Sequence, residues 1–232
     1  MTTWESIKLL ALYKSSLSRV LSEIELTHLR KMIIRSQAVK FALVPGAGKR
    51  SQGSERVFLD SIDSEPVIFV DIDGFKKPDI IADLTCSWPL KEDLFDLIVS
   101  TWVIEHLSNP KVFFREAFRV LQDKGTLVCS VPFIHRKHGS PGDWWRLSDT
   151  ALSYLSGTAG FSEVQIQPVG GTPCIACLSL LWPFLRLPLM GFFLFVLAWG
   201  IDALIGLSCK ITGKGRELIE SYPISYIVVA KK

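Results

Sequence analysis

The stretch F-D-L-I-V-S-T-W-V-I-E-H-L, residues 95–107, decides the fold of this chain. Its apolar run stops at two hydroxyl residues, Ser100 and Thr101, and restarts with helical spacing from Trp102, which predicts a buried strand followed by a helix over 102–107. In an open parallel sheet, ligands bind where such strands end. We therefore expect a site at the carboxyl end of this strand.

Further apolar runs repeat this pattern along the chain, at 41–44, 67–70, 79–82, 126–131, 164–167 and 224–229. A helix is predicted over 111–121, with Asn109 as its cap, Pro110 in its first turn and Gly125 as its terminator. Strands that alternate with helices indicate an α/β fold. The prediction is a Rossmann-like, doubly wound sheet of seven strands, with an N-terminal helical segment and an apolar helical hairpin inserted between strands six and seven.

Composition and charge divide the chain into four parts. We expect an amphipathic helical segment over 1–40, a core over 41–173, an apolar helical insertion over 174–209, and a return to the core over 210–232. The net charge of +3 is distributed over them as +4, −4, 0 and +3. An acidic core argues against a nucleic-acid groove, whereas basic ends permit contact with an anionic surface. Five scattered cysteines suit a reducing compartment, so a cytoplasmic location is expected.

The insertion contains an unbroken apolar run over 187–201, shorter than the roughly twenty residues that span a bilayer. Two short helices that meet near Pro188 are predicted. Three placements stay open: a hairpin in one leaflet on the inner face of the cytoplasmic membrane, a buried or homodimer-forming hairpin, and a true span. Cys174 and Cys177 have metal-ligand spacing, but no second ligand pair accompanies them, so no metal site is expected.

The ends of the first three strands carry residues suited to a nucleotide-like ligand. Gly46-Ala47-Gly48 allows the backbone to turn tightly and approach a ligand, although Arg50 stands where a phosphate-binding loop has Ser or Thr. Asp71 and Asp83 end the next two strands. A carboxylate accepts two hydrogen bonds at once, so Asp71 suits ribose hydroxyls, and Asp83 is placed to meet an adenine ring.

These pieces, together with F-R-E-A-F-R-V-L-Q-D-K-G-T-L-V at 114–128, resemble the class I S-adenosylmethionine-dependent methyltransferases over roughly 41–161. The resemblance implies methyl transfer with S-adenosylmethionine as the cofactor. It also implies the cofactor-binding residues, which are Gly46, Ala47, Gly48, Asp71, Ile72, Asp83, Leu84, Ser100, Thr101 and Trp102.

A second motif, H-G-S-P-G-D-W-W-R at 138–146, is similar to a segment of a methyltransferase subgroup associated with bacterial cell-surface polysaccharide synthesis. The acceptor is then expected to be a hydroxyl of a small molecule or glycan, in a reaction at a membrane surface. A hydroxyl acceptor needs a base, and histidine titrates near neutral pH. His138 with Asp143 is the preferred pair, His106 is the second candidate, and Arg146 offers a fixed cation.

Two other functions are weighed against this one. Val44 and Arg50 replace an acid and a third glycine that the family often has, so a catalytically silent, membrane-associated interaction module is the alternative. An NAD-dependent enzyme is a weaker reading, because the third glycine that allows close helix packing is missing.

Overall fold

The computed structural model describes residues 39–46, 66–139, 142–170, 173–181, 188–212 and 221–232. The chain divides into two compact units. Among the described residues, one unit contains those from 39 to 132 together with 137–167 and 226–232, and the other contains 133–136 and those between 168 and 225. The segment 1–38, where the N-terminal helix is predicted, lies outside the described residues, and the four-part division stays a prediction.

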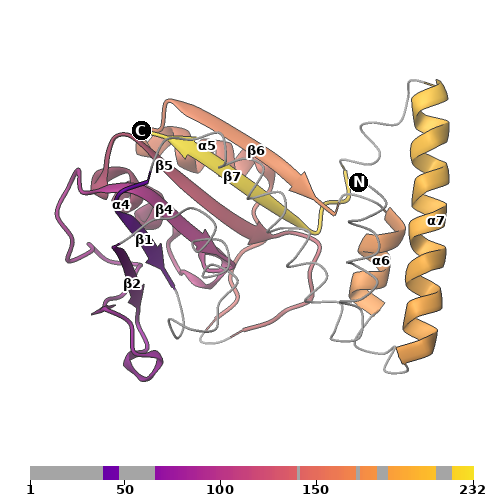
Figure 1. Cartoon of the computed structure of the whole chain (residues 1–232), viewed down its shortest axis with the longest axis horizontal. Coiled ribbons are helices and arrows are strands. Elements are labelled where there is room, and N and C mark those ends of the chain that lie inside the picture. The colour runs from indigo at the N-terminus through magenta and orange to yellow at the C-terminus, as the bar shows by residue number, and fades with distance from the viewer. Residues whose placement is uncertain (1–38, 47–65, 140–141, 171–172, 182–187, 213–220) are drawn as a thin grey trace. The chain divides into compact units, whose positions relative to one another are not determined.

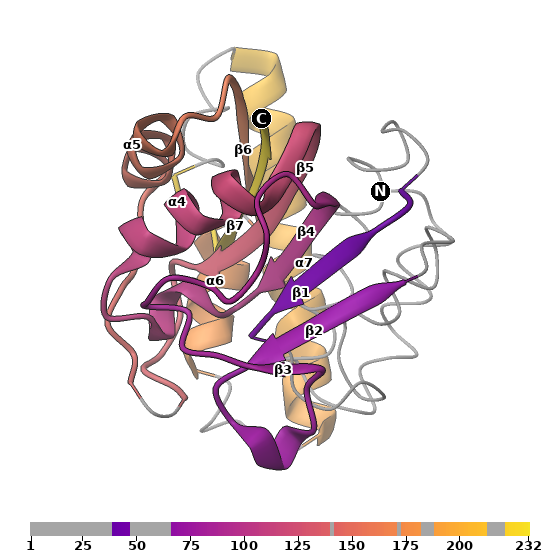
Figure 2. The same cartoon turned by 90° about the vertical axis from the view of Figure 1, so that its left-hand side faces the viewer.

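The strands form one sheet, with seven strands in the described residues and the order β3-β2-β1-β4-β5-β7-β6 (Figures 1 and 2). Their bounds are β1 (Ala42–Pro45), β2 (Val67–Asp71), β3 (Ile80–Ile81), β4 (Phe95–Thr101), β5 (Leu121–Pro132), β6 (Glu163–Val169) and β7 (Ser225–Lys231). The pairs β1–β2, β1–β4, β2–β3 and β4–β5 are parallel. The strand order reverses between β1 and β4, which makes their carboxyl ends the switch point of a doubly wound sheet.

Strand β7 runs antiparallel to both of its neighbours, whereas β6 runs in the same direction as β5. The amide of Lys232 donates to the carbonyl of Gly125 at the start of β5, and the amide of Phe133 after β5 donates to Ile224 before β7, so β7 is antiparallel to β5. The amide of Ser162 donates to the carbonyl of Lys231, which makes β6 antiparallel to β7. The predicted α/β sheet of seven strands is thus confirmed.

The central strands are buried as parallel strands must be when both faces are covered. Ala42, Leu43 and Val44 have no exposed surface. In β4 the stretch 97–100 is buried throughout, which explains why the sequence shows a continuous apolar run and not an alternation.

Two helices of this unit, α4 (Pro110–Val120) and α5 (Asp149–Ala159), pack against each other beside the sheet (Figure 2). Pro110 is the first residue of α4, as predicted, but the side chain of Asn109 makes no capping hydrogen bond. The side chain of Ser148 caps α5 by accepting from the amide of Ala151, 3.3 Å away. Gly160 ends α5 in the left-handed conformation that glycine favours.

Two expected boundaries were wrong. The helix expected over 102–107 is a single 3₁₀ turn, η2 (Ile104–His106), because Leu107 is already extended and Pro110 starts the next helix. Gly125 does not end α4, since the chain is extended from Leu121 onward and this glycine lies inside β5. A second 3₁₀ turn, η1 (Gly74–Lys76), follows β2.

The other unit contains α6 (Pro173–Leu181) and α7 (Pro188–Thr212), which pack against each other. Two helices were predicted, and α7 begins at Pro188, but it is 25 residues long and does not stop at Asp202. Asp202 is buried, and its carboxylate accepts from the amide of Cys174 in the first turn of α6, 3.1 Å away. Within the described residues, no helix combines the length and apolar character needed to cross a membrane.

Candidate active site

The candidate site lies at the carboxyl ends of β1 and β4, and Gly46 forms the turn that leaves β1. Its φ is +76°, and its amide donates to the carbonyl of Val70, 2.7 Å away. A Cβ at this position would lie 2.4 and 2.5 Å from the two methyl carbons of Val103. Both the backbone angle and the space therefore require glycine, as predicted for this turn. The neighbouring Ala47 and Gly48 lie outside the described residues.

Asp71 ends β2 with a buried carboxylate, 4% exposed. One oxygen, Oδ1, accepts from the amide of Asp73 at 2.9 Å, and Oδ2 lies 3.3 Å from the Nζ of Lys76. A carboxylate has about four acceptor positions, so these two partners leave room for further hydrogen bonds. Ile72, the next residue, exposes 59% of its surface at the same strand end.

Asp83 lies just after β3 and is exposed. Its Oδ1 accepts from both the amide and the hydroxyl of Thr85, at 2.8 and 2.7 Å. These hydrogen bonds, the backbone one first, lower the pKa of Asp83, so the side chain is a stable anion. Leu84 is buried, and its carbonyl accepts from the indole of Trp88 at 3.4 Å.

The end of β4 is held in a strained conformation. The buried hydroxyl of Ser100 donates to the carbonyl of Pro45 at 3.3 Å, which ties β4 to β1 at the switch point, and Thr101 is the last residue of the strand. Trp102 has a φ of +55°, and its amide donates to the carbonyl of Ser130 at 3.0 Å. A bulky residue in the left-handed region costs about 1–2 kcal/mol, and such strain concentrates at functional sites.

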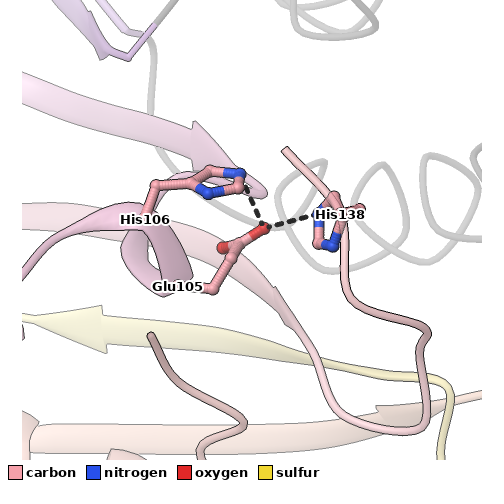
Figure 3. Close-up of side chains that lie close together, drawn as sticks. All are labelled: Glu105, His106 and His138. Atoms are coloured by element: carbon pink, nitrogen blue, oxygen red, sulfur yellow. Dashed lines mark ion pairs between the residues drawn. The ribbon is translucent and has the colours of Figure 1, made fainter. Parts of the chain in front are cut away.

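Directly after this turn, Glu105, His106 and His138 converge (Figure 3). The Oε1 of Glu105 lies 3.4 Å from the Nε2 of His138 and 3.7 Å from the Nε2 of His106. The carboxylate is 1% exposed, whereas the two imidazoles are 18–19% exposed. The ring centroids of the two histidines are 5.2 Å apart. A buried anion thus faces two imidazoles that solvent can still reach.

The loop over 138–146 packs onto this cluster. A Cβ on Gly139, whose φ is +84°, would lie 2.2 Å from the Cε1 of His106, so the loop backbone sits directly on that ring. The Nδ1 of His106 hydrogen-bonds the carbonyl of Gly142, and the amide of Trp144 donates to the carbonyl of Glu105 at 2.8 Å. The indole of Trp145 donates to the carbonyl of Leu107, also at 2.8 Å.

Asp143 organises the same loop through a pair of contacts. One carboxylate oxygen accepts from the amide of His138 at 2.8 Å and lies 3.5 Å from the Nδ1 of that ring. Both oxygens are held by the guanidinium of Arg146, at 2.8 Å for Nη2 to Oδ2. These hydrogen bonds from Arg146 keep the pKa of Asp143 well below its usual range, and they raise the pKa of Arg146.

The structure therefore brings together all four residues predicted as catalytic: His138, Asp143, His106 and Arg146. It also connects them to the predicted cofactor side, because the ring centroids of Trp102 and His138 are 5.4 Å apart. The functional side chain that the sequence did not single out is Glu105. Its position beside His106 after the strand was a signal, but a Glu before a histidine gives no indication of burial until the fold places it.

Comparison with known proteins identifies the domain. Residues 62–129 match the protein family described as "Methyltransferase domain". This region of the chain is therefore similar to methyltransferase domains. The match covers strands β2 to β4 and most of β5, including the acidic strand ends and Glu105 and His106. No curated protein matches the chain in sequence.

Solved structures share the fold of this methyltransferase. An S-adenosylmethionine-dependent methyltransferase from Archaeoglobus fulgidus aligns with a TM-score of 0.58 and 16% identity, over 91% of this chain and 94% of that one. A similar enzyme from Mesorhizobium loti aligns with a TM-score of 0.54 and 15% identity, over 90% and 98%. Phosphoethanolamine N-methyltransferase 2 of Haemonchus contortus, in complex with S-adenosyl-L-methionine, gives 0.56 and 14%, over 90% of this chain and 52% of that one.

These findings confirm three predictions: a methyltransferase, its Rossmann-like fold, and S-adenosylmethionine as its cofactor. They favour the enzyme over the silent module and over an NAD-dependent enzyme. The residues present fit the cofactor, because Gly46 leaves a strand end without a side chain, Asp71 keeps free acceptor positions and Asp83 is an exposed anion. The individual binding residues and the polysaccharide subgroup stay predictions.

Proposed function

We propose that this methyltransferase transfers a methyl group to a hydroxyl of a small molecule or glycan. The observation that carries the proposal is the contact between Trp102, at the strained end of β4, and His138, in a cluster with Glu105 and His106. This contact supports a site in which the surface that binds the methyl donor and the surface that binds the acceptor meet at Trp102 and His138. The glycan class rests on the resemblance of 138–146 to a subgroup associated with polysaccharide synthesis.

The cofactor side is assigned to the carboxyl ends of β1 to β4. Gly46, with Ala47 and Gly48, would lie under the methionine part, Asp71 would accept from the ribose hydroxyls, and Ile72, Asp83 and Leu84 would border the adenine. Ser100, Thr101 and Trp102 would line the side of the sulfonium. When bound, S-adenosylmethionine supplies an activated, electrophilic methyl group. The anionic strand ends suit a cationic cofactor that carries no phosphate.

On the acceptor side, the residues orient a hydroxyl and receive its proton. Asp143 holds the Nδ1 side of His138, which leaves Nε2 as the atom that accepts the proton, and His106 presents its Nε2 to the same place. The indole surfaces of Trp144 and Trp145, 62% and 38% exposed, offer flat apolar faces for a ring. Alignment of the two reactants would supply up to roughly 7–11 kcal/mol of the barrier reduction.

Transfer of a labelled methyl group from S-adenosylmethionine tests this proposal. The acceptors are matched pairs of sugars with free and blocked hydroxyls, with the corresponding amino sugars as a second arm. We expect label only where a free hydroxyl is present, and His138→Ala or His106→Ala should slow turnover more than about tenfold. The matched control is Glu163→Gln, an exposed residue that pairs with Lys231. Labelling of amines alone, or full activity of both histidine variants, would refute the assignment.

We also propose that the insertion over 174–209 contacts the inner face of the cytoplasmic membrane. The support is a set of exposed apolar side chains on α7, which are Phe193, Val196, Leu197, Trp199, Ile201, Leu204 and Leu207. Burial of apolar surface and basic flanks both favour an anionic interface. Flotation with anionic vesicles should carry the chain, and Leu197→Asp with Leu204→Asp should abolish it. A dimer in solution that these substitutions dissociate, without flotation, would instead assign the surface to a second copy.

A further inference from the structure

We infer that Glu105, His106 and His138 form a binding site for one divalent transition-metal cation. The inference concerns the same site as the proposed function, and it rests on that function only for its catalytic consequence. The binding itself follows from the geometry of the three side chains, so it can be measured without an acceptor or a methyl donor.

The first argument is the direction in which each ring presents its lone pair. The Nδ1 of His106 faces the carbonyl of Gly142, which can only accept, so this nitrogen carries a hydrogen. The Nδ1 of His138 lies 3.5 Å from the Oδ2 of Asp143, an anionic acceptor, which favours a hydrogen on this nitrogen as well. In the neutral imidazoles the lone pairs are then on the two Nε2 atoms. Both Nε2 atoms point toward the Oε1 of Glu105 (Figure 3).

Three electron-pair donors that converge on one point call for a positive charge between them. The three ligand atoms lie within 4.8 Å of one another. Two of the separations, 3.4 and 3.7 Å, are close to the roughly 3.3–3.6 Å between ligands in a tetrahedral site with bonds of about 2.0–2.2 Å. Two imidazoles and one carboxylate are the ligand set of catalytic zinc sites that keep the fourth position open.

The surroundings also resemble those of a metal centre. Metal-bound histidines usually donate their second ring nitrogen to a carboxylate or a backbone carbonyl, which fixes the tautomer and the orientation of the ring. Here Asp143 and the carbonyl of Gly142 occupy these two positions. Arg146 pairs with Asp143 through their hydrogen bonds, and the buried carboxylate of Glu105 faces the two Nε2 atoms. A buried anion beside two lone pairs favours a cation.

The competing arrangement places protons, and not a metal, on both Nε2 atoms. It would bring two imidazolium charges together with ring centroids 5.2 Å apart, beside Arg146, and like charges at such a distance repel. One divalent cation satisfies the same three atoms without that repulsion. A cation there would favour the ionised form of a nearby hydroxyl, which is the task otherwise assigned to the imidazoles.

Zinc binding measured by competition with a chromophoric chelator tests this inference. The protein carries no affinity tag and contains Cys174→Ser and Cys177→Ser, so that thiolates of this pair do not contribute. We expect one Zn²⁺ per chain. His138→Ala and Glu105→Gln should each weaken binding at least about 100-fold, and Asp143→Asn about 10–100-fold, because it only orients a ligand. The control His135→Ala changes a histidine outside the three and should bind like the parent.

Cobalt substitution and unfolding without metal complete the test. Co²⁺ should give the visible absorption of a four- or five-coordinate nitrogen and oxygen site, and this absorption should disappear in His138→Ala. Thermal unfolding without metal establishes that each variant is folded. Absence of stoichiometric Zn²⁺, or equal affinity in the parent and in both ligand variants, would overturn the inference. Zinc binding without methyl transfer to any hydroxyl would leave the metal site standing and refute the proposed function.

Discussion

Replacement of Gly46 by alanine tests the turn on which the candidate site is built. The alanine must adopt a φ of +76°, which costs a non-glycine residue about 1–2 kcal/mol. Its Cβ would also lie 2.4 and 2.5 Å from the methyl carbons of Val103, and overpacking of this kind costs about 1–3 kcal/mol. Val103 cannot rotate away easily, because a β-branched side chain is restricted at χ1. The expected loss of unfolding free energy is therefore about 2–5 kcal/mol.

A double-mutant cycle separates the two contributions. Val103→Ala alone removes two buried methyl groups and should cost about 1.5–3 kcal/mol. In the double variant the two methyl carbons that obstruct the new Cβ are gone and only the Cβ of residue 103 stays close, at 3.0 Å, so most of the overpacking disappears and the backbone strain remains. We expect a favourable coupling energy of about 1–3 kcal/mol. Urea unfolding of the four proteins, at equal denaturant slopes, measures it.

Additive effects, within about 0.3–0.5 kcal/mol, would refute the reasoning, because independent sites behave in that way. The same four proteins should be titrated with S-adenosylmethionine. If the backbone of Gly46 approaches the cofactor, Gly46→Ala should weaken cofactor binding more than Val103→Ala does. Equal affinities for S-adenosylmethionine in both single variants would mean that the backbone of Gly46 does not approach the cofactor.

Three further substitutions test contacts inside each of the two units. Burial opposes ionisation of Glu116, but hydrogen bonds from Arg119 and from the backbone of Trp88 outweigh it and lower the pKa of Glu116 below the ordinary 4.5. The stabilisation from this carboxylate is therefore complete above pH 4.5 and is lost as the pH falls through the lowered pKa. Glu116→Gln should cost about 1–3 kcal/mol at pH 7 and remove this part of the acid sensitivity, whereas an unchanged acid midpoint would contradict it. Lys232→Met should cost about 1 kcal/mol in urea unfolding, since Nζ contacts Asp93 and the carbonyl of Leu121 at 2.6 and 2.7 Å, and no loss would contradict it. Asp202→Leu should lower the helical circular dichroism signal because it removes the acceptor for α6, while Asp202→Asn should retain most of it.

The fold was predictable because its central strands have a clear sequence pattern. Parallel strands buried on both faces give continuous apolar runs, and Ala42 to Val44 and the stretch 97–100 are such runs. The boundaries of helices were less predictable. Gly125 has the features of a helix terminator, but the pairing of β5 with β4 extends the chain from Leu121, four residues earlier. Tertiary pairing thus overrode a local signal.

The candidate site was predictable in its residue types and not in its geometry. His106 and His138 are far apart in the sequence, and only the loop over 138–146 brings their Nε2 atoms to the same carboxylate. Glu105 was not among the predicted site residues because its burial depends on that loop and on η2. Likewise, Asp202 seemed to end an apolar helix, whereas it caps α6 from within α7. Interactions between distant segments are absent from local sequence patterns.

Calorimetric titration with S-adenosylmethionine tests the central claim most directly. We predict saturable binding of one cofactor per chain, and binding at least about tenfold weaker in Asp71→Asn, because a carboxylate that accepts from ribose hydroxyls loses a charge-assisted hydrogen bond. Asp93→Asn changes the same charge at the opposite end of the sheet and should leave the affinity unchanged. No binding at millimolar cofactor, or equal affinity in Asp71→Asn and the parent, would contradict the account.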